Sequence, residues 1–484
     1  MNLTKRIILF GLGPHAKRIY FPLILKFSKE MNFELVKIVD LESKRDSIQD
    51  YLAKKGVDIE VYYISPDQQS YDFLHPKVEE DLNLMIREKK VDGIIIATEP
   101  LVHLMYAKWA LQNGLSILMD KPISTYKDVS TSLEKAKKIQ TDFFELEELY
   151  QRARIKNQNL SFSIMAQRRF HSSYQKIGEL IKECFRKTNC PVTSIQSFHS
   201  DGEWRMPTEM IEQNYHPYNQ GYGKCSHSGY HFFDLVASFL KAGSNNEKYF
   251  DNVEIGTNFV RPLDFMEQFN LNDYGLIFGK DNFQKQNKYS GEELTQAMKD
   301  LGELDAFSTL CFKKKNRIMA VATINLLHNG FSRREWLSSK DRDLYKGNGR
   351  VRQETHIIQQ GPFQSIHYHS YQAREVDPTV NRELYSVGGE YHSDIYVFRN
   401  PLLGEKAFEI ISIRDLHGLI LDGNSRGHQE DARAKGFIEF IESLHGLRRH
   451  EQMSSDFSSH QGAVLIMSGI YQAGCQNEKI RLEV

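Results

Sequence analysis

A glycine-rich turn near the N-terminus constrains this chain more than any other feature. Gly11-x-Gly13-x-x-Ala16 follows the apolar run of residues 7–10 and opens a predicted helix that begins at Pro14. In this context Gly11 permits a tight turn, Gly13 lets the backbone approach a pyrophosphate, and Ala16 keeps the helix close to a sheet. Pro14 suits the first helical position, and the N-terminus of the helix offers amide groups to phosphate. The pattern predicts the dinucleotide-binding corner of a Rossmann domain; a glycine turn without a ligand is the alternative.

Asp40 indicates which dinucleotide this turn would hold. It ends the second apolar run, residues 33–39, about two dozen residues beyond the glycines, where a carboxylate accepts hydrogen bonds from ribose hydroxyls. This position favours NAD over NADP. Lys44 and Arg45 lie close enough to keep NADP open as the less favoured cofactor, because a cationic side chain there accommodates a 2′-phosphate.

The order of apolar runs and helical patterns predicts two domains. Residues 1–125 alternate short apolar runs with helical segments, which is typical of a doubly wound parallel sheet of the α/β class. After Pro122 the pattern changes, and we expect residues 126–484 to form an α+β domain. Its sheet is expected to be open and mainly antiparallel. Two polar stretches, near 243–305 and 338–389, are predicted to be insertions outside that sheet, such as lids or oligomer arms.

Charge and composition exclude several classes of partner. Lys plus Arg number 62 and Asp plus Glu 63, so the net charge of −1 gives no reason to expect nucleic acid or an anionic membrane surface. No apolar run approaches the roughly 20 residues of a membrane span. The five cysteines are scattered and lack CxxC spacing, which indicates reduced thiols in the cytoplasm and argues against a zinc site or a disulfide framework.

Two segments carry residues suited to chemistry. Asp120-Lys121-Pro122 follows the apolar run of residues 116–119, and ligands bind at the carboxyl ends of strands in an open α/β sheet. Lys121 would lie beside a nicotinamide there, unless it is an ordinary surface lysine. His227 and His231 are four residues apart and share one face of a predicted helix. Three roles are open for such a pair: a proton acceptor with its orienting partner, a metal site, or a structural helix cap. No HExxH carboxylate accompanies it, so we predict no metal.

Several motifs occur in the order typical of one known family. They are Gly11-Leu-Gly13-Pro14-His15-Ala16, Ala97-Thr98-Glu-Pro-Leu-Val-His103, Gly114-Leu-Ser-Ile-Leu-Met-Asp120-Lys121-Pro122, Gln167-Arg-Arg169-Phe and Gly229-Tyr-His231-Phe-Phe-Asp234-Leu. On these motifs the chain resembles the glucose–fructose oxidoreductase, inositol dehydrogenase and rhizopine-catabolism (Gfo/Idh/MocA) family. The family's Glu-Lys-Pro has Asp120 in place of its acid, and the family's Asp-x-x-x-His has His227 in place of its acid.

The resemblance implies an oxidoreductase that moves hydride between a nicotinamide cofactor and a hydroxyl or ketone group of a sugar, cyclitol or related polyol. Lys121 would bind the reacting oxygen, His231 would take the hydroxyl proton, and His227 would orient His231 or bind a substrate hydroxyl. The residues implied to hold the cofactor are Gly11, Gly13, Pro14, His15, Ala16, Asp40, Thr98, His103, Asp120 and Pro122. The candidate substrate residues are Arg169, Trp204 and Tyr222.

Two other functions stay open for a chain with this resemblance. One is an NAD-dependent glycosidase or lyase that oxidises its substrate transiently, and the other is a non-catalytic dinucleotide-binding sensor or regulator. The presence of both Lys121 and His231 favours the dehydrogenase. The resemblance also implies that residues 126–484 bind a small-molecule substrate and mediate a homo-oligomer, a dimer or tetramer. Nucleic acid and membrane partners are not expected, on the charge and composition given above.

Overall fold

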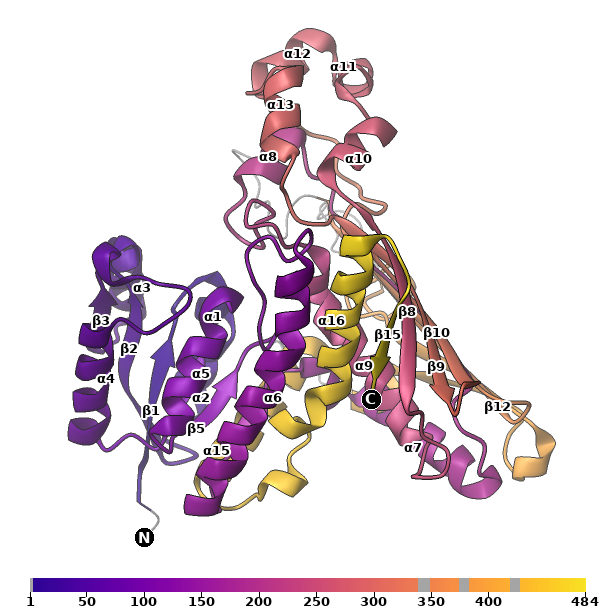
Figure 1. Ribbon diagram of the computed structural model, residues 1–484, viewed down its shortest axis with the longest axis horizontal. Helices are drawn as coiled ribbons and strands as arrows, with labels where there is room; N and C mark the ends of the chain where they lie inside the picture. The colour runs from indigo at the N-terminus through magenta and orange to yellow at the C-terminus, as the bar shows by residue number, and fades with distance from the viewer. Residues whose placement is uncertain (1–2, 338–348, 374–382, 418–426) are drawn as a thin grey trace. The chain divides into compact units, whose positions relative to one another are not determined.

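The computed structural model describes residues 3–337, 349–373, 383–417 and 427–484, and the chain divides into two compact units (Figure 1). Unit 1 consists of Met1–Thr125, Ile139–His171 and Gln429–Gln461. Unit 2 consists of Tyr126–Lys138, Ser172–His428 and Gly462–Val484. The first break lies between Thr125 and Tyr126. Two later segments, which we expected in the second domain, return to unit 1 because one adds a strand to its sheet and the other a helix to its core.

Unit 1 is built on a six-stranded parallel sheet in the order β3-β2-β1-β4-β5-β6. The strands are β1 (Lys5–Phe10), β2 (Phe33–Leu41), β3 (Val61–Ile64), β4 (Gly93–Ile96), β5 (Ser116–Met119) and β6 (Phe162–Ile164). Every residue of β4 and β5 is buried, as expected for strands that helices cover on both faces. The strand order reverses between β1 and β4, and this sheet confirms the predicted doubly wound α/β domain.

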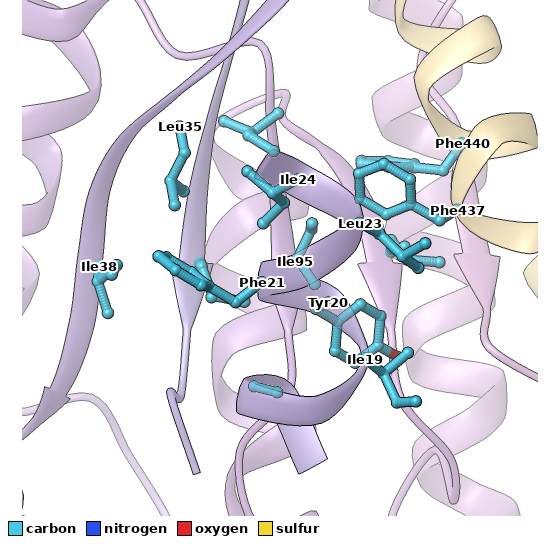
Figure 2. Packing of buried hydrophobic residues seen from close by; sticks show 14 of the residues in the cluster. Ile19, Tyr20, Phe21, Leu23, Ile24, Leu35, Ile38, Ile95, Phe437 and Phe440 are labelled. Carbon is cyan, nitrogen blue, oxygen red and sulfur yellow. The ribbon is translucent and has the colours of Figure 1, made fainter. Parts of the chain in front are cut away.

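A single core cluster joins the sheet of unit 1 to helices from both ends of the chain (Figure 2). The helices of this unit are α1 (Pro14–Arg18), α2 (Tyr20–Phe27), α3 (Arg45–Lys55), α4 (Pro76–Lys89), α5 (His103–Gln112), most of α6 (Leu133–Lys156) and α15 (His428–Leu444). Phe437 of α15 stacks on Phe27 of α2, with ring centroids 6.5 Å apart, and meets Phe33 of β2 edge-on at 5.8 Å. Burying one such ring stabilises a fold by about 2–3 kcal/mol, so α15 is an integral part of this core.

Unit 2 is built on a nine-stranded sheet in the order β14-β13-β12-β11-β7-β10-β9-β8-β15. The strands are β7 (Ser194–Ser200), β8 (Asn252–Val260), β9 (Asp305–Lys314), β10 (Arg317–Leu327), β11 (Val351–Gln360), β12 (Gln364–Ala373), β13 (Asp394–Arg399), β14 (Phe408–Ser412) and β15 (Ile480–Glu483). Among the described pairs, β7 and β10 run parallel and the others antiparallel. Along β9, β11 and β12 one face is buried and the other is partly or fully exposed. The open, mainly antiparallel sheet is therefore confirmed.

The predicted insertion near 243–305 is partly wrong. Its first half contains β8, which lies in the sheet between β9 and β15. The remainder leaves the sheet as short helices, which together with α8 (Pro207–Glu212) we name the helical cap. These helices are α10 (Pro262–Gln268), α11 (Leu271–Phe278), α12 (Lys280–Gln286) and α13 (Gly291–Met298). The cap has a core of its own around Met210, Tyr274 and Phe283, so it is a packed subdomain.

The predicted insertion near 338–389 is wrong for most of its described residues. β11 and β12 both fall in this range, and β11 pairs with β7 near the middle of the sheet. Polar residues such as Thr355 and His367 alternate with buried ones along these strands, which made the segment look irregular. Residues 338–348 and 374–382 lie outside the described residues. In the described part of the chain, no helix is both long and apolar enough to span a bilayer.

The remaining helices of unit 2 complete its layer structure. They are α7 (Ser172–Thr188), α9 (Tyr230–Ala242), α14 (Ile413–His417) and α16 (Gln461–Gln476). α9 packs on α7 and on β7 and β10, and its residues from Tyr230 to Val236 are all buried. The predicted helix that carries His231 is thus part of the core of unit 2.

Candidate functional site

The fold requires a glycine at only one of the two glycine positions in the turn. Gly11 adopts a φ of +87°, and a Cβ added to it would lie 2.8 Å from the carbonyl oxygen of Ala97. The fold itself therefore requires Gly11. A Cβ added to Gly13 would meet no atom within 4 Å, so nothing in the described chain requires a glycine there. An open backbone at the start of α1, which begins with Pro14 and has Ala16 fully buried, fits a pyrophosphate.

Asp40 connects the end of β2 to this turn. Its carboxylate accepts hydrogen bonds from the amide of Leu12 at 2.6 Å and from the amide of Leu41 at 2.7 Å. The acid therefore lies against the glycine turn, where lone pairs of the same carboxylate can accept ribose hydroxyls.

His103 organises the loops that follow β4 and β5. Its imidazole is fully buried, with Nδ1 2.8 Å from the carbonyl oxygen of Pro122 and Nε2 3.1 Å from that of Thr98. Burial lowers the pKa of His103, although both carbonyl contacts oppose the shift. The ring is engaged by backbone on both sides, so we now expect it to hold the two loops together and not to touch a cofactor. The Thr98 hydroxyl is buried without a hydrogen-bond partner among the described residues and is free to meet a ligand.

Asp120 also faces the glycine turn. The Nε2 atom of His15 approaches its Oδ2 at 3.2 Å, without the alignment of a hydrogen bond, and the amide of Lys121 donates to Oδ1 at 2.9 Å. Burial opposes ionisation of Asp120, yet the charges of protonated His15 and of Lys121 outweigh it and hold the pKa of this carboxyl below its usual range. The segment that carries Lys121 therefore lies beside the predicted dinucleotide site.

Replacing Gly13 with valine is expected to weaken NAD binding by at least about tenfold, or about 1.4 kcal/mol, without changing the thermal unfolding of the protein. A Cβ at position 13 would meet no protein atom within 4 Å, so we expect the added side chain to obstruct a ligand and not the fold. Isothermal titration with NAD and thermal unfolding measure the two effects. Gly11→Ala is the matched control, and it should lower stability as well, because of its positive φ and its contact with Ala97. Wild-type NAD affinity in Gly13→Val would refute the proposed cradle.

Acid should destabilise the fold partly through His15. Burial lowers the pKa of this histidine from 6.5 to about 4, so the native state holds the neutral ring while the unfolded chain binds a proton below pH 6.5. This contribution to stability is complete above pH 6.5 and is lost as the pH falls towards 4. A fifth of the side chain is exposed, so we expect a loss of about 1–2 kcal/mol. His15→Gln should remove that part of the pH dependence in denaturant unfolding; equal pH profiles for the two proteins would contradict this assignment.

In unit 2, His227 and His231 lie on one continuous helical segment. His227 belongs to a π-helical turn, η5 (Cys225–Gly229), which runs directly into α9, where His231 is the second residue. Both are buried, at 5% and 6% exposure. Gly223 is essential to the entry, because a Cβ there would lie 1.9 Å from the carbonyl oxygen of Glu303. π-Helical turns are frequent at functional sites, which agrees with the predicted role of this pair.

Aromatic side chains surround His227. The ring of His216 stacks on it at 4.7 Å with an interplanar angle of 9°. Tyr218 and Tyr222 meet it edge-on at 5.3 Å and 5.4 Å. Tyr222, a candidate substrate residue, thus lies beside His227, and its role at a substrate stays a prediction. The contact of His216 was not predicted. We name these three side chains the aromatic box.

The other two candidate substrate residues are engaged elsewhere. Trp204 stacks on Tyr274 at 6.0 Å in the helical cap and donates its indole N–H to that hydroxyl at 3.3 Å. Arg169 donates to the carbonyl oxygens of Ser459 at 3.1 Å and Ser454 at 3.3 Å. These contacts give Trp204 and Arg169 a structural role. Neither residue contacts the aromatic box through them.

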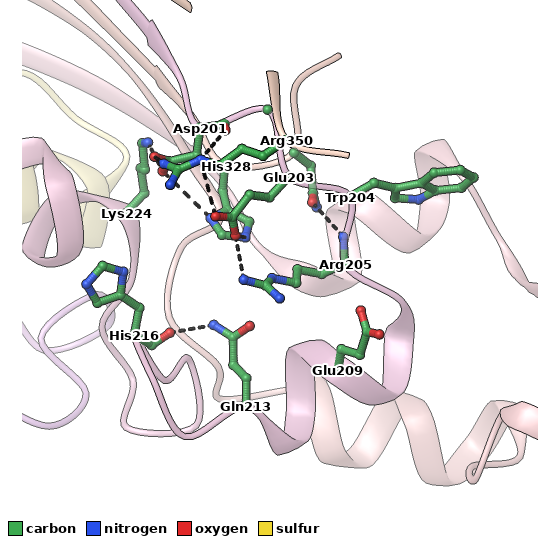
Figure 3. A network of polar contacts seen from close by, with 12 residues as sticks. Asp201, Glu203, Trp204, Arg205, Glu209, Gln213, His216, Lys224, His328 and Arg350 are labelled. Carbon is green, nitrogen blue, oxygen red and sulfur yellow. Dashed lines mark hydrogen bonds and ion pairs between the residues drawn. The ribbon is translucent and has the colours of Figure 1, made fainter. Parts of the chain in front are cut away.

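A network of buried charges, which sequence reasoning missed, lies beside the helical entry of His227 (Figure 3). Its members follow β7 (Asp201, Glu203 and Arg205), follow β10 (His328), begin β9 (Asp305), precede β11 (Arg350) or begin the π-helical turn (Lys224). Because β11, β7, β10 and β9 are neighbours, these positions meet at one edge of the sheet. The only signal in the sequence was the alternation of acid and base in Asp201-Gly-Glu203-Trp-Arg205, which a surface loop shows equally well.

The contacts of this network centre on Asp201. Lys224, fully buried, donates to Asp201 and lies 3.0 Å from Nδ1 of His199. Arg350 donates to Asp201 at 2.6 Å. Arg205 donates to Glu203 at 2.6 Å, and Nε2 of His328 lies 3.5 Å from Glu203.

Burial and the charges of neighbouring groups both shift the pKa values in this network. Burial lowers the pKa of the Lys224 ammonium and raises the pKa of Asp305 to about 6. Burial also disfavours the ionised form of Asp201, but Lys224 and its other cationic neighbours hold the pKa of that carboxyl well below its usual range. Among the described residues, no group of three or more His, Cys, Asp or Glu side chains is arranged to hold a metal ion.

Lys121 belongs to unit 1, whereas His231 and His227 belong to unit 2. Their convergence beside one nicotinamide depends on how the units meet, and it stays a prediction. Each unit by itself supplies its part of the expected site: a glycine turn with Asp40 and Lys121 in one, and a buried histidine pair with its aromatic box in the other.

Comparison with known proteins extends these observations. The family model described as an oxidoreductase family with an NAD-binding Rossmann fold, Gfo/Idh/MocA, matches residues 5–151. A search of curated proteins finds no match. Solved structures with a similar fold include an oxidoreductase from Agrobacterium radiobacter in complex with NAD+, L-tartaric acid and magnesium, at 11% identity and a TM-score of 0.56, covering 99% of this chain and 98% of that one.

Two further structures are similar over nearly their whole length. The aldose-aldose oxidoreductase from Caulobacter crescentus, complexed with glycerol, has 11% identity and a TM-score of 0.55, with coverage of 99% of this chain and 100% of that one. A myo-inositol dehydrogenase from Corynebacterium glutamicum has 13% identity and a TM-score of 0.51, with 99% of each chain covered. At such identities the similarity shows the fold alone, and it covers both units.

Proposed function

We propose that this chain, whose residues 5–151 match the Gfo/Idh/MocA family of NAD-binding oxidoreductases, transfers hydride between NAD and a hydroxyl or ketone group of a sugar, cyclitol or related polyol. The observation that carries the proposal is the contact of Asp120 with His15 at 3.2 Å, which puts the Lys121 segment beside the glycine turn. A cation at that edge of the sheet is suited to the oxygen of a substrate lying over the nicotinamide.

The residues of this chain have separate tasks in such a reaction. Bound NAD supplies the hydride acceptor, and NADH the donor, in the two directions. Lys121 hydrogen-bonds the reacting oxygen and stabilises the negative charge that develops on it. His231 takes the proton of the substrate hydroxyl as the carbonyl forms and returns it in the reverse direction. His227 binds a second hydroxyl or orients His231.

The aromatic box supports a polyhydroxylated substrate. The rings of His216, Tyr218 and Tyr222 offer apolar faces together with polar edges, and such surfaces suit sugar rings. Two of the proteins with a similar fold are named for an aldose and for myo-inositol, which are polyhydroxylated compounds of this class.

We propose NAD over NADP as the cofactor in use. Of the two cations that kept NADP open, Lys44 and Arg45, Arg45 donates to both carboxylate oxygens of Glu42 at 2.6 Å and 2.7 Å, and its guanidinium lies 4.1 Å from the centroid of the Tyr63 ring. A phosphate would have to displace Glu42. The free thiols of all five cysteines agree with the reducing cytoplasm, which we propose as the compartment.

A screen of polyols, aldoses, cyclitols and their oxidised forms with NAD or NADH tests the proposal. Production or consumption of NADH, with a matching oxidised or reduced product by mass spectrometry, is the expected result. Release of a sugar without net NADH would support the glycosidase or lyase. Tight NAD binding without turnover of any compound would support the sensor and overturn the dehydrogenase.

We also propose that the outer face of the nine-stranded sheet joins copies of this chain. Phe307 of β9 and Phe398 of β13, with Phe408 and Ile410 of β14, expose between 39% and 53% of their surface on strands whose opposite face is buried. Light scattering should show a dimer or tetramer, and Phe398→Lys with Ile410→Lys should give monomers. Leu402→Lys, at an 83% exposed position between β13 and β14, is the control and should leave the assembly intact. A monomeric wild type would refute this interface.

A further inference from the structure

The loop between α8 and the π-helical turn holds one residue in an unusual backbone conformation. His216 has a φ of +52°, in the left-handed region that side chains other than glycine rarely adopt. Its carbonyl oxygen accepts a hydrogen bond from the side-chain amide of Gln213 at 2.5 Å (Figure 3). Farther along, the amide of Gly221 donates to the carbonyl of Tyr218 at 3.0 Å. The loop therefore holds His216 in a defined place, and such backbone conformations gather at functional sites.

That conformation delivers the imidazole of His216 to His227. The two rings are nearly parallel, at 9° and 4.7 Å, and His216 also stacks on its neighbour Tyr215 at 4.2 Å and 24°. Tyr218 and Tyr222 approach His227 edge-on, at 71° and 70°. His216 thus covers one face of the buried His227 ring, and Tyr218 and Tyr222 contact the ring from the sides. Rotation of the His227 ring must therefore displace a neighbour.

We propose that His216 is a positioning residue for His227, setting the ring plane in which His227 meets the substrate or His231. This inference rests on the proposed dehydrogenase function. The chemical reason lies in the residue type at 227. The nitrogens of a neutral imidazole, one a donor and one an acceptor, make their hydrogen bonds in the plane of the ring, so that plane decides which groups they can reach. A flat ring stacked on His227 fixes this plane without using either nitrogen of His227.

Two variants separate positioning from a general loss of structure. Asparagine also tolerates a positive φ, so His216→Asn keeps the loop and removes the ring. His216→Phe keeps a flat ring and removes the nitrogens. With NAD and a polyol substrate, His216→Asn should lower kcat by about 10- to 100-fold with KM changed by less than about threefold, because small displacements of catalytic groups have effects of that size. His216→Phe, made separately in the wild-type chain, should keep kcat within about threefold of the wild-type value.

Two results would overturn the proposal. Wild-type kcat in His216→Asn would show that the stack is dispensable. An equal loss in His216→Phe, in a variant whose crystal structure keeps the new ring stacked on His227, would show that the imidazole nitrogens of residue 216 matter, and not its stacking face.

A second measurement does not depend on turnover. Crystal structures of the NAD-loaded variants should show the His227 ring rotated relative to Tyr222 in His216→Asn and unchanged, near 70°, in His216→Phe. An unrotated ring in His216→Asn would refute positioning even if no polyol is a substrate. Conversely, if the screen fails while the ring rotates, only the proposed dehydrogenase function is lost.

Discussion

Replacing Lys121 with alanine is expected to lower kcat by about 10²- to 10³-fold while the affinity for NAD changes by less than about threefold. Lys121 directly follows β5 and the buried Asp120, which contacts His15 of the glycine turn at 3.2 Å. In the proposed reaction this cation stabilises charge on the reacting oxygen, an interaction that exists chiefly in the transition state. Its loss therefore appears in kcat, whereas the dinucleotide keeps the glycine turn and Asp40. Initial rates and isothermal titration with NAD measure the two quantities.

His231→Asn is the companion variant and should lose about 10²- to 10⁴-fold in kcat, the usual range for a missing general base. If the two residues act on the same oxygen, Lys121→Ala combined with His231→Asn should lose little more than the worse single variant. Lys108→Ala is the control in unit 1, because Lys108 forms a partly exposed ion pair with Glu145 at 2.7 Å and should not affect the rate. Unchanged rates in both single variants would remove the proposed mechanism.

Replacing Asp201 with alanine is expected to destabilise unit 2 by about 3–5 kcal/mol. Asp201 accepts from Lys224, which is fully buried, and from Arg350 at 2.6 Å. Removing the acid leaves the buried ammonium without its counter-ion, and the cost of that unpaired charge exceeds the value of the pair itself. Calorimetry should show the transition of unit 2 at a lower temperature. Unfolding of a chain with two units is not a single two-state transition, so the transitions must be resolved.

A second substitution identifies the cause of this loss. Lys224→Met added to Asp201→Ala removes the stranded ammonium and should recover part of the stability, because an apolar replacement of a buried pair is often tolerated. Lys288→Ala is the surface control: its pair with Glu212 is 63% and 40% exposed and should contribute less than about 1 kcal/mol. An unchanged unfolding temperature in Asp201→Ala would show that the network does not stabilise the unit. No recovery in the double variant would show that the buried ammonium is not the cause.

Local sequence was enough to predict the parallel sheet on which the expected nucleotide-binding residues lie. Gly11, Asp40 and Lys121 each stand at the end of a parallel strand, and the carboxyl ends of such strands meet at one edge of the sheet. The family resemblance assigned His103 to the cofactor, whereas its ring lies between two backbone carbonyls. The motif placed this residue correctly in the fold, and only the coordinates showed which way its nitrogens point.

The pattern of polar residues misled the prediction of the second unit. β11 and β12 alternate polar and buried side chains on a sheet with one open face, so their low hydrophobicity was interpreted as an insertion. Trp204 was assigned to the substrate because it is a large aromatic residue, yet it packs on Tyr274. An aromatic residue is suited to either environment, and its neighbours come from distant parts of the chain.

By itself the sequence determined the features that depend on neighbouring residues: the glycine turn, the parallel nucleotide-binding sheet, and the helix that carries His227 and His231. Only the tertiary structure decided that α15 completes the core of unit 1, that Asp201 and Lys224 pair in a buried network, and that His216 covers His227. The reason is that backbone geometry and hydrophobic periodicity act over a few residues, whereas burial, ion pairing and ring stacking are set by segments that folding brings together from far apart.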